Sequence, residues 1–193
     1  PFDRGRDGFV MGEGAGALIL ESLAHAKKRK ARMYAEVAGY AATSEAHDMV
    51  IPREDGEEVA TTMRLALKDA GVTPAQVDYI NAHATSTSVG DAVEVKAIRL
   101  MFKSRADKLA INATKSLVGH TLGAAGSLAG VVSALTLTSG QIHPTLNLDD
   151  PDPACALAGL SKDPQTRKAK VALINAFGFG SNNAAVVLQA VSS

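Results

Sequence analysis

The chain has 193 residues, and its 20 Lys and Arg residues balance its 20 Asp and Glu residues, so the formal net charge is zero. We therefore expect neither nucleic acid nor an anionic membrane as a partner, because both attract strongly basic chains. Hydrophobic residues make up 46% and charged residues 21%, which is typical of a folded protein and too apolar for a disordered tail. The length suffices for about one domain.

The cysteine content and the first residues bear on the compartment. Cys155 has no second cysteine with which to form an internal disulfide or a cysteine metal cluster, which suits a reducing compartment. The five histidines lack the spacing of a zinc motif, so no metal is expected. Residues 1–9 have neither the basic nor the apolar region of a secretory signal. We expect a protein that is not secreted and a chain that begins within a longer polypeptide.

Hydrophobic periodicity and turn residues predict alternating strands and helices. The predicted elements are a strand over 15–21, a short helix capped by Ser22, a strand over 34–43, a helix over 57–70, a turn at 73–74, a strand over 77–82, a helix over 91–102, a strand over 109–113, a helix over 121–138, and strands over 171–176 and 184–190. This order predicts an α/β fold with a mixed sheet and layered helices. The Gly-rich link 177–183 predicts an antiparallel return between the last two strands.

The segment 116–148 contains no Asp, Glu, Lys or Arg, so a membrane span has to be considered. A membrane-spanning helix needs about 20 mostly apolar residues. The helix predicted over 121–138 is interrupted by glycine and hydroxyl residues, and His120 and Pro144 flank it. We therefore favour a central helix that is buried among other protein elements, with no membrane span.

Two histidines stand where predicted strands and turns meet. His83 follows the strand 77–82 in the run Asn-Ala-His-Ala-Thr-Ser-Thr, and His120 directly precedes the helix 121–138, shortly after Lys115. Ligands gather at strand ends in open α/β sheets. A neutral imidazole there can donate one hydrogen bond to a developing oxyanion. A single histidine more often has a structural role, but the pair with Lys115 makes a catalytic site an equal alternative.

Five blocks of sequence together resemble the C-terminal half of a β-ketoacyl-acyl-carrier-protein synthase, the condensing enzyme of type II fatty-acid synthesis. The blocks lie at residues 1–16, 81–87, 114–120, 122–126 and 177–180. The resemblance covers nearly the whole chain and implies a thiolase-like fold, with residues 1–193 as a single C-terminal domain. It also implies that the nucleophilic cysteine belongs to an N-terminal half absent from this sequence. The chain alone is then expected to be inactive, with no catalytic role for Cys155.

The resemblance carries the family's catalytic roles onto residues of these blocks. His83 and His120 would stabilise the enolate formed by decarboxylation and polarise the malonyl thioester carbonyl. Lys115, paired with Glu94, would fix the electrostatics of the site. His83, Lys115 and His120 are thus the implied catalytic residues, with Glu94 in a supporting role.

Further implied roles concern the substrate arm and the acyl pocket. Thr85 and Thr87 would hydrogen-bond the phosphopantetheine arm that an acyl-carrier protein carries, and no other cofactor is expected. The backbone N–H of Phe179 would form half of an oxyanion hole, and its ring would gate the acyl pocket. Gly178 and Gly180 would let this loop move.

Five positions depart from the family's usual pattern. Asp48 and Val50 stand where histidine and threonine are common, in a segment that resembles a second gating loop. Ser181-Asn182 replaces the usual Gly-Thr after the Phe-Gly-Phe-Gly block, and Ala176 replaces a usual serine. We expect these changes to affect gating and to stiffen or re-pair the turn, without removing a catalytic group.

The implied reaction is the decarboxylating condensation of an acyl thioester with malonyl-acyl-carrier protein to a 3-ketoacyl product. Residues 81–87 favour a discrete fatty-acid enzyme over a polyketide-type ketosynthase, which stays as the enzymatic alternative. A non-catalytic partner subunit that sets chain length is the second alternative, although the retained His83, Lys115 and His120 argue against it. By resemblance we expect a homodimer in a bacterial cytoplasm, or in a plastid or mitochondrial matrix.

Overall fold

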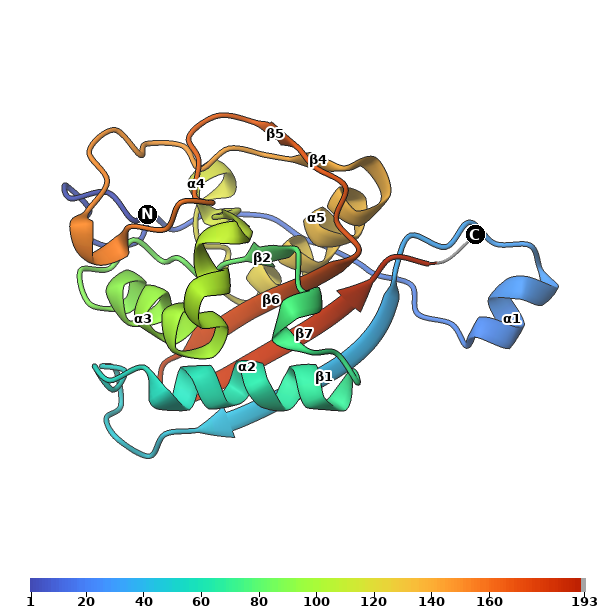
Figure 1. Cartoon of the computed structure of the whole chain (residues 1–193), viewed down its shortest axis with the longest axis horizontal. Coiled ribbons are helices and arrows are strands. Elements are labelled where there is room, and N and C mark those ends of the chain that lie inside the picture. Colours follow the sequence, from blue (N-terminus) through green and yellow to red (C-terminus); the bar gives the residue numbers. More distant parts are fainter. Residues whose placement is uncertain (192–193) are drawn as a thin grey trace.

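The computed structural model describes residues 1–191 as a five-stranded sheet with helices on both faces (Figure 1). The helices are α1 (Leu23–Lys28), α2 (Glu57–Asp69), α3 (Gly90–Phe102), α4 (Lys115–Val118) and α5 (Ala125–Ser139), and short 3₁₀ turns span Pro74–Gln76, Lys103–Lys108, Leu122–Ala124 and Pro153–Cys155. The strands are β1 (Glu36–Ser44), β2 (Tyr79–Asn81), β3 (Ala110–Asn112), β4 (Gln141–Ile142), β5 (Gln165–Thr166), β6 (Val171–Gly178) and β7 (Asn182–Gln189). The predicted α/β class is confirmed.

The main sheet has the strand order β1-β7-β6-β2-β3. The strand β2 pairs in parallel with β3 and with the central strand β6, whereas β7 runs antiparallel to both β6 and β1. The predicted mixed sheet and the antiparallel return of the last strand are therefore confirmed. The ladder reaches Gly178 opposite Asn182, so only residues 179–181 form the turn, which is shorter than predicted. A separate ribbon of β4 and β5 was not predicted.

Alternate residues of β6 build the cores on the two faces of the sheet. Leu173 belongs to the larger core, which α2 and α3 cover, while Ala172 and Ile174 belong to the smaller core beneath α5. This is the period of two that a strand buried on both faces shows. Figure 1 shows α2 and α3 over one face of β6 and β7, with α5 behind them. The sheet is thus the middle layer of the described chain.

The strand predicted over 15–21 is wrong, because residues 12–20 form no ladder. They run along α5 instead: a Cβ on Gly16 would lie 2.8 Å from the Ser127 hydroxyl, and Leu18 lies directly over Gly130. An apolar run becomes a strand only where a neighbouring strand can pair with its backbone. The pattern indicated an extended segment correctly but could not show that its neighbour is a helix.

The helix α5 is buried on one face only. Within residues 1–191, the segment Leu122–Ser139 is long and apolar enough to cross a membrane by length and composition, and 28% of it is buried in this chain. Ala129, Ser133 and Leu137 face the sheet, while Leu122 and Leu135 are exposed. The expectation of a buried central helix is therefore met on the sheet side and not on the other.

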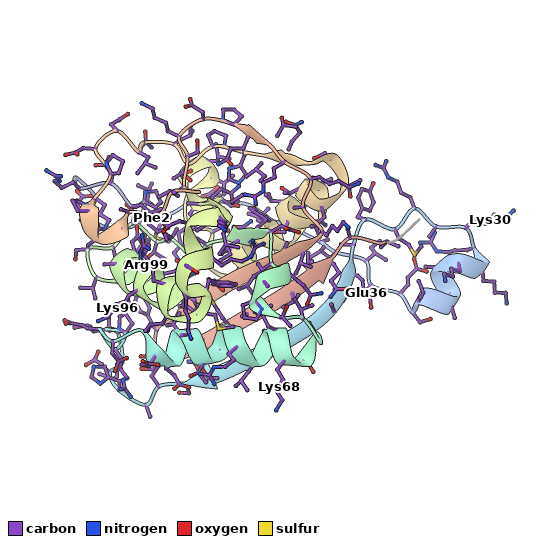
Figure 2. All side chains as sticks on the ribbon, in the orientation of Figure 1. Phe2, Lys30, Glu36, Lys68, Lys96 and Arg99 are labelled. Atoms are coloured by element: carbon purple, nitrogen blue, oxygen red, sulfur yellow. The ribbon has the colours of Figure 1, made fainter. Side chains whose placement is uncertain are left out.

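The helix α1 projects from the body of the protein (Figure 1). Ser22 caps it as predicted, since its hydroxyl accepts the N–H of His25. Figure 2 shows Lys30 on this projection, at the opposite end of the molecule from Phe2. The site described below is therefore built by the body of the chain and not by α1.

Candidate active site

The ends of β2 and β3 bring His83 and Lys115 together. Asn81 and Asn112 are paired in parallel register, so the segments that follow them leave the same edge of the sheet. His83 lies two residues after β2, and Lys115 begins α4 three residues after β3. Ligand sites in α/β sheets form at this edge, and the structure places these two residues together there.

His83 lies close to both other candidate groups. Its ring centroid is 5.8 Å from that of His120, and the two planes are nearly perpendicular at 88°. The Lys115 Nζ donates to the carbonyl oxygen of His83 at 2.6 Å and lies 3.4 Å from Nδ1 of its ring. The three residues that the sequence singled out therefore form one cluster.

The hydrogen bonds of the two imidazoles indicate their tautomers. Nδ1 of His120 accepts the N–H of Leu122 at 3.1 Å, so the proton of a neutral ring is on Nε2. Nδ1 of His83 faces the ammonium group of Lys115, a donor, which likewise assigns its proton to Nε2. In each neutral ring the contact with Lys115 or Leu122 is made through Nδ1, so the N–H at Nε2 does not take part in it.

Burial keeps both imidazoles neutral. It lowers the pKa of His83 well below 6.5, and the nearby charge of Lys115 lowers it further. The same two causes lower the pKa of His120. Burial also lowers the pKa of Lys115 to about 8, against the opposing effect of Glu94. At neutral pH the cluster therefore contains two uncharged imidazoles beside one ammonium group.

Glu94 holds the backbone of the His83 segment. Its two carboxylate oxygens accept the N–H groups of His83 at 2.9 Å and Ala84 at 2.8 Å, and Asn175 donates to it as well. Burial raises the pKa of this carboxyl group. The expected pairing with Lys115 is not seen, since no ion pair joins the two within the described residues. The carboxylate satisfies backbone donors instead, and both residues bind His83.

These residues surround one cavity of about 570 Å³. Of the residues predicted for the site, it is lined by His83, Thr85, Thr87, Glu94, Lys115, His120, Gly178 and Phe179. The hydroxyls of Thr85 and Thr87 lie 3.2 Å apart at this cavity, and that of Thr87 also accepts the N–H of Gly90. An apolar cavity with a few converging polar groups is the usual form of a small-molecule site.

The turn after β6 carries Phe179 at the cavity. Phe179 is 65% exposed as a residue, and the following Gly180 has a φ of 76°, a left-handed conformation that favours glycine. Gly178 has no such requirement, because a Cβ there would make only an ordinary contact with Asn182. Gly180 does not line the cavity but adjoins it through Phe179.

Three contributors were missed by the sequence reasoning. Phe9 packs against His120 with ring centroids 5.3 Å apart, and Phe177 packs against His83 at 5.4 Å. Arg6 joins three segments: its guanidinium donates to the carbonyls of Thr87 and Ser88 and forms an ion pair with Asp152. The position of Phe9 and Arg6 in a matched motif block was a signal, but their contacts depend on the tertiary fold.

Other nucleophilic and metal-binding groups are not part of the cluster. Cys155 is buried away from the cavity lining, and burial raises its thiol pKa to about 11. Among residues 1–191, no group of three or more His, Cys, Asp or Glu side chains is placed to hold a metal ion. The chemistry that this cluster supports is hydrogen bonding to a developing negative charge.

Comparison with known proteins gives concordant matches. Residues 34–149 match the family described as "Beta-ketoacyl synthase, C-terminal domain", and residues 1–26 match the N-terminal domain of the same family. The chain is 45% identical over 191 residues to 3-oxoacyl-[acyl-carrier-protein] synthase 2 of Coxiella burnetii, covering 99% of this chain and 46% of that protein. It is 46% identical over 187 residues to the chloroplastic 3-oxoacyl-[acyl-carrier-protein] synthase I of Hordeum vulgare, covering 97% and 40% respectively. The chain thus spans about half the length of these relatives.

Solved structures match over the whole chain. A ketosynthase of a type II polyketide system, in complex with its acyl-carrier protein, has a TM-score of 0.97 and 41% identity, covering 100% of this chain and 47% of that one. A β-ketoacyl synthase from Burkholderia phymatum has a TM-score of 0.93 and 38% identity, covering 100% and 46%. The thiolase-like fold expected from the sequence is confirmed.

Proposed function

Because the chain belongs to the β-ketoacyl synthase family, we propose that it is the C-terminal part of an enzyme that condenses an acyl thioester with malonyl-acyl-carrier protein. The names of the relatives from Coxiella burnetii and Hordeum vulgare support this reaction. The matches cover under half of each relative, so the remaining part of the enzyme would supply the nucleophilic cysteine. The product would be a 3-ketoacyl thioester that is two carbons longer.

The observation that carries the proposal is the pair of neutral imidazoles of His83 and His120 at one cavity. When the malonyl carboxylate leaves as carbon dioxide, the electron pair of the broken C–C bond becomes an enolate. Two N–H donors that converge on the thioester oxygen stabilise that negative charge by hydrogen bonding, without transferring a proton to it. Lys115 keeps His83 in the tautomer that can donate.

The second step forms the new carbon–carbon bond. The enolate carbon attacks the acyl thioester, and the cysteine sulfur leaves as a thiolate. The oxyanion that forms transiently on the acyl carbonyl needs donors of its own, for which we propose the backbone N–H of Phe179. The chain therefore contributes to both steps, from two sides of the cavity.

The acyl groups would arrive on the phosphopantetheine arm of an acyl-carrier protein. Thr85 and Thr87 line the cavity with their hydroxyls, and we assign them to the arm. The ketosynthase described above in complex with its acyl-carrier protein supports this partner. The bacterial and chloroplastic relatives support a cytoplasmic or plastid location, and we expect a homodimer.

The test uses the full-length enzyme with His120→Ala. We expect release of carbon dioxide from malonyl-acyl-carrier protein to fall by about 10²–10³-fold, while acylation of the cysteine continues, as followed by intact mass. His25→Ala on the projecting α1 serves as the control and leaves both reactions unchanged. Unimpaired decarboxylation in the His120 variant would contradict the role of the imidazole pair.

A polyketide-type ketosynthase is the second candidate, because the match with a TM-score of 0.97 is to such an enzyme. The two candidates share the chemistry and differ in the acyl group that they extend. Assays with saturated acyl chains and with poly-β-keto chains on the same carrier protein separate them. Preference for saturated chains supports the fatty-acid enzyme, and preference for poly-β-keto chains supports the alternative. A residue other than cysteine at the nucleophile position would indicate a non-catalytic partner subunit.

A further inference from the structure

We propose that Ser181 is a positioning residue that joins the turn carrying Phe179 to the loop 45–51, so that these two walls of the cavity move as one unit. The loop follows β1 and the turn precedes β7, and these two strands are neighbours in the sheet, since Ser44 at the end of β1 is paired with Asn182 at the start of β7. Phe179, Val50 and Ile51 line the cavity from these segments. The consequence for condensation rests on the proposed function, whereas the coupling itself does not.

The backbone of Ser181 is in an unfavourable conformation. Its φ is 59°, in the left-handed region where glycine is at ease and other residues are strained. It follows Gly180, which is also left-handed, and it is buried although it sits in a turn. A serine in such a position needs contacts from its side chain that glycine cannot make.

The Ser181 hydroxyl makes those contacts with the other segment. Its Oγ donates to the carbonyl oxygen of Asp48 at 2.7 Å and accepts the N–H of the same residue at 3.4 Å. The backbone adds two more bonds, from Glu45 N–H to the Ser181 carbonyl at 2.9 Å and from Gly180 N–H to the Met49 carbonyl at 2.7 Å. Four hydrogen bonds thus join two adjacent turn residues to one loop.

Asp48 also hydrogen-bonds the residues of its own loop that line the cavity. Its Oδ1 accepts the N–H groups of Val50 at 2.8 Å and Ile51 at 2.9 Å, which fixes the wall residues relative to Asp48. Ser181 holds the backbone of Asp48 on the other side. Displacement of Phe179 together with its turn therefore requires either the breaking of these bonds or movement of Val50 and Ile51.

Hydrogen exchange in the full-length protein tests the coupling directly. Ser181→Ala removes the hydroxyl and keeps the strained backbone, while Ser181→Gly removes the hydroxyl and relieves the strain, so the second variant folds at least as readily. In both we expect the amides of residues 45–51 to exchange about tenfold faster, because the two hydrogen bonds between the Ser181 Oγ and Asp48 are lost. Unchanged exchange in both variants would overturn the proposal.

Asn182→Ala is the matched control, from the residue that directly follows this turn at the start of β7. Its Nδ2 donates to the Phe179 carbonyl at 3.2 Å, a bond that stays within the turn. We expect this variant to leave exchange in 45–51 at the wild-type rate. Equal acceleration in the Asn182 and Ser181 variants would show general loosening of the turn and overturn the specific role of Ser181.

Kinetics separates positioning from catalysis. In the Ser181 variants we expect KM for acyl-carrier-protein substrates to rise several-fold while kcat of malonyl decarboxylation stays within twofold, since His83, Lys115 and His120 are untouched. An unchanged KM, or a fall in kcat as large as the rise in KM, would contradict a positioning role. If the wild-type protein does not condense acyl groups at all, the proposed function fails, and the exchange result still decides the coupling.

Discussion

The ammonium group of Lys115 contacts two atoms of one residue, donating to the carbonyl oxygen of His83 at 2.6 Å and lying 3.4 Å from Nδ1 of its ring. A protonated lysine is a donor only, so it holds Nδ1 as an acceptor and leaves the proton on Nε2. The charge state of Lys115 therefore controls which ring nitrogen of His83 carries the proton and can donate a hydrogen bond. The site depends on a lysine whose pKa burial has lowered to about 8.

The first prediction concerns pH. Decarboxylation by the full-length enzyme should fall as pH rises through about 8, because Lys115 then loses the proton that orients His83. The decline on the acid side should begin below about pH 6.5, the ordinary pKa of histidine, because the pKa values of both His83 and His120 are lowered. The measurement is the rate of carbon dioxide release as a function of pH.

Lys115→Arg is the diagnostic variant for this profile. Arginine stays charged to a pH above about 12, so the alkaline decline assigned to Lys115 should disappear even if the overall rate is lower. An alkaline limb at the same pH in this variant would assign the decline to another group.

The second prediction concerns the carboxylate beneath His83. Glu94→Gln leaves one amide oxygen to serve N–H groups of both His83 and Ala84, so at least one buried donor loses its partner. We expect the free energy of unfolding to fall by about 1–3 kcal/mol and kcat to fall more than about tenfold. Denaturant unfolding of the full-length protein measures the first effect, and single-turnover decarboxylation measures the second.

An exposed glutamate provides the control for this change. Glu57 lies in the first turn of α2 and is exposed. Glu57→Gln should alter the free energy of unfolding by no more than about 0.5 kcal/mol. Similar losses in the two variants would mean that the hydrogen bonds of Glu94 contribute little.

The third prediction compares two reasons why a position near α2 is glycine: lack of space for a side chain and a left-handed backbone. A Cβ on Gly39 would lie 2.5 Å from the backbone N of Ala70 and 2.6 Å from the carbonyl oxygen of Ala66, so β1 and α2 would have to separate. Gly71 has a φ of +63° and open space around it. We expect Gly39→Ala to destabilise the protein by about 3 kcal/mol or more and Gly71→Ala by about 1 kcal/mol, as measured by denaturant unfolding. The reverse ranking would show that β1 and α2 can readily adjust.

The fourth prediction concerns the buried cysteine. Cys155 should not react with iodoacetamide in the native protein, because its thiol is buried and its pKa is raised to about 11. Cys155→Ala should leave formation of the acyl adduct unchanged, as followed by intact mass. Loss of the adduct in this variant would assign the nucleophile to this chain.

The sequence predicted the elements with strong internal periodicity and missed those that depend on a neighbour. The helix over 57–70 and the strand over 171–176 were correct within a few residues, because their apolar faces and their terminal glycines are local signals. The run 15–21 looked like a strand but packs along α5, and nothing in its own residues reveals that neighbour. The short β4 and β5 pair only with each other and have too few residues to show a period.

The candidate site was predictable in membership and not in detail. His83, Lys115 and His120 were found because they follow strands or begin helices in motif blocks, and the structure places them together. A direct ion pair between Lys115 and Glu94 is not seen in the described residues, because Glu94 binds backbone N–H groups that a sequence does not display; its charge still raises the pKa of Lys115. Departures from the family pattern were visible at Asp48 and Ser181, but the hydrogen bonds between them arise only when β1 and β7 are paired.

The pairing of the short strands β2 and β3 determines which features of this site can change and which cannot. Neighbouring strands of any sheet lie about 4.8 Å apart, so the spacing of segments that leave their ends is inherited from the sheet. The relative placement of His83 and Lys115 is therefore set by main-chain pairing at Asn81 and Asn112 and not by the loops around the cavity. Substitutions in the loop 45–51 or in the turn at 179–181 can change which molecules enter the cavity, while the two proposed catalytic groups keep their spacing. If the proposed function holds, substrate preference can therefore change without loss of the condensation chemistry.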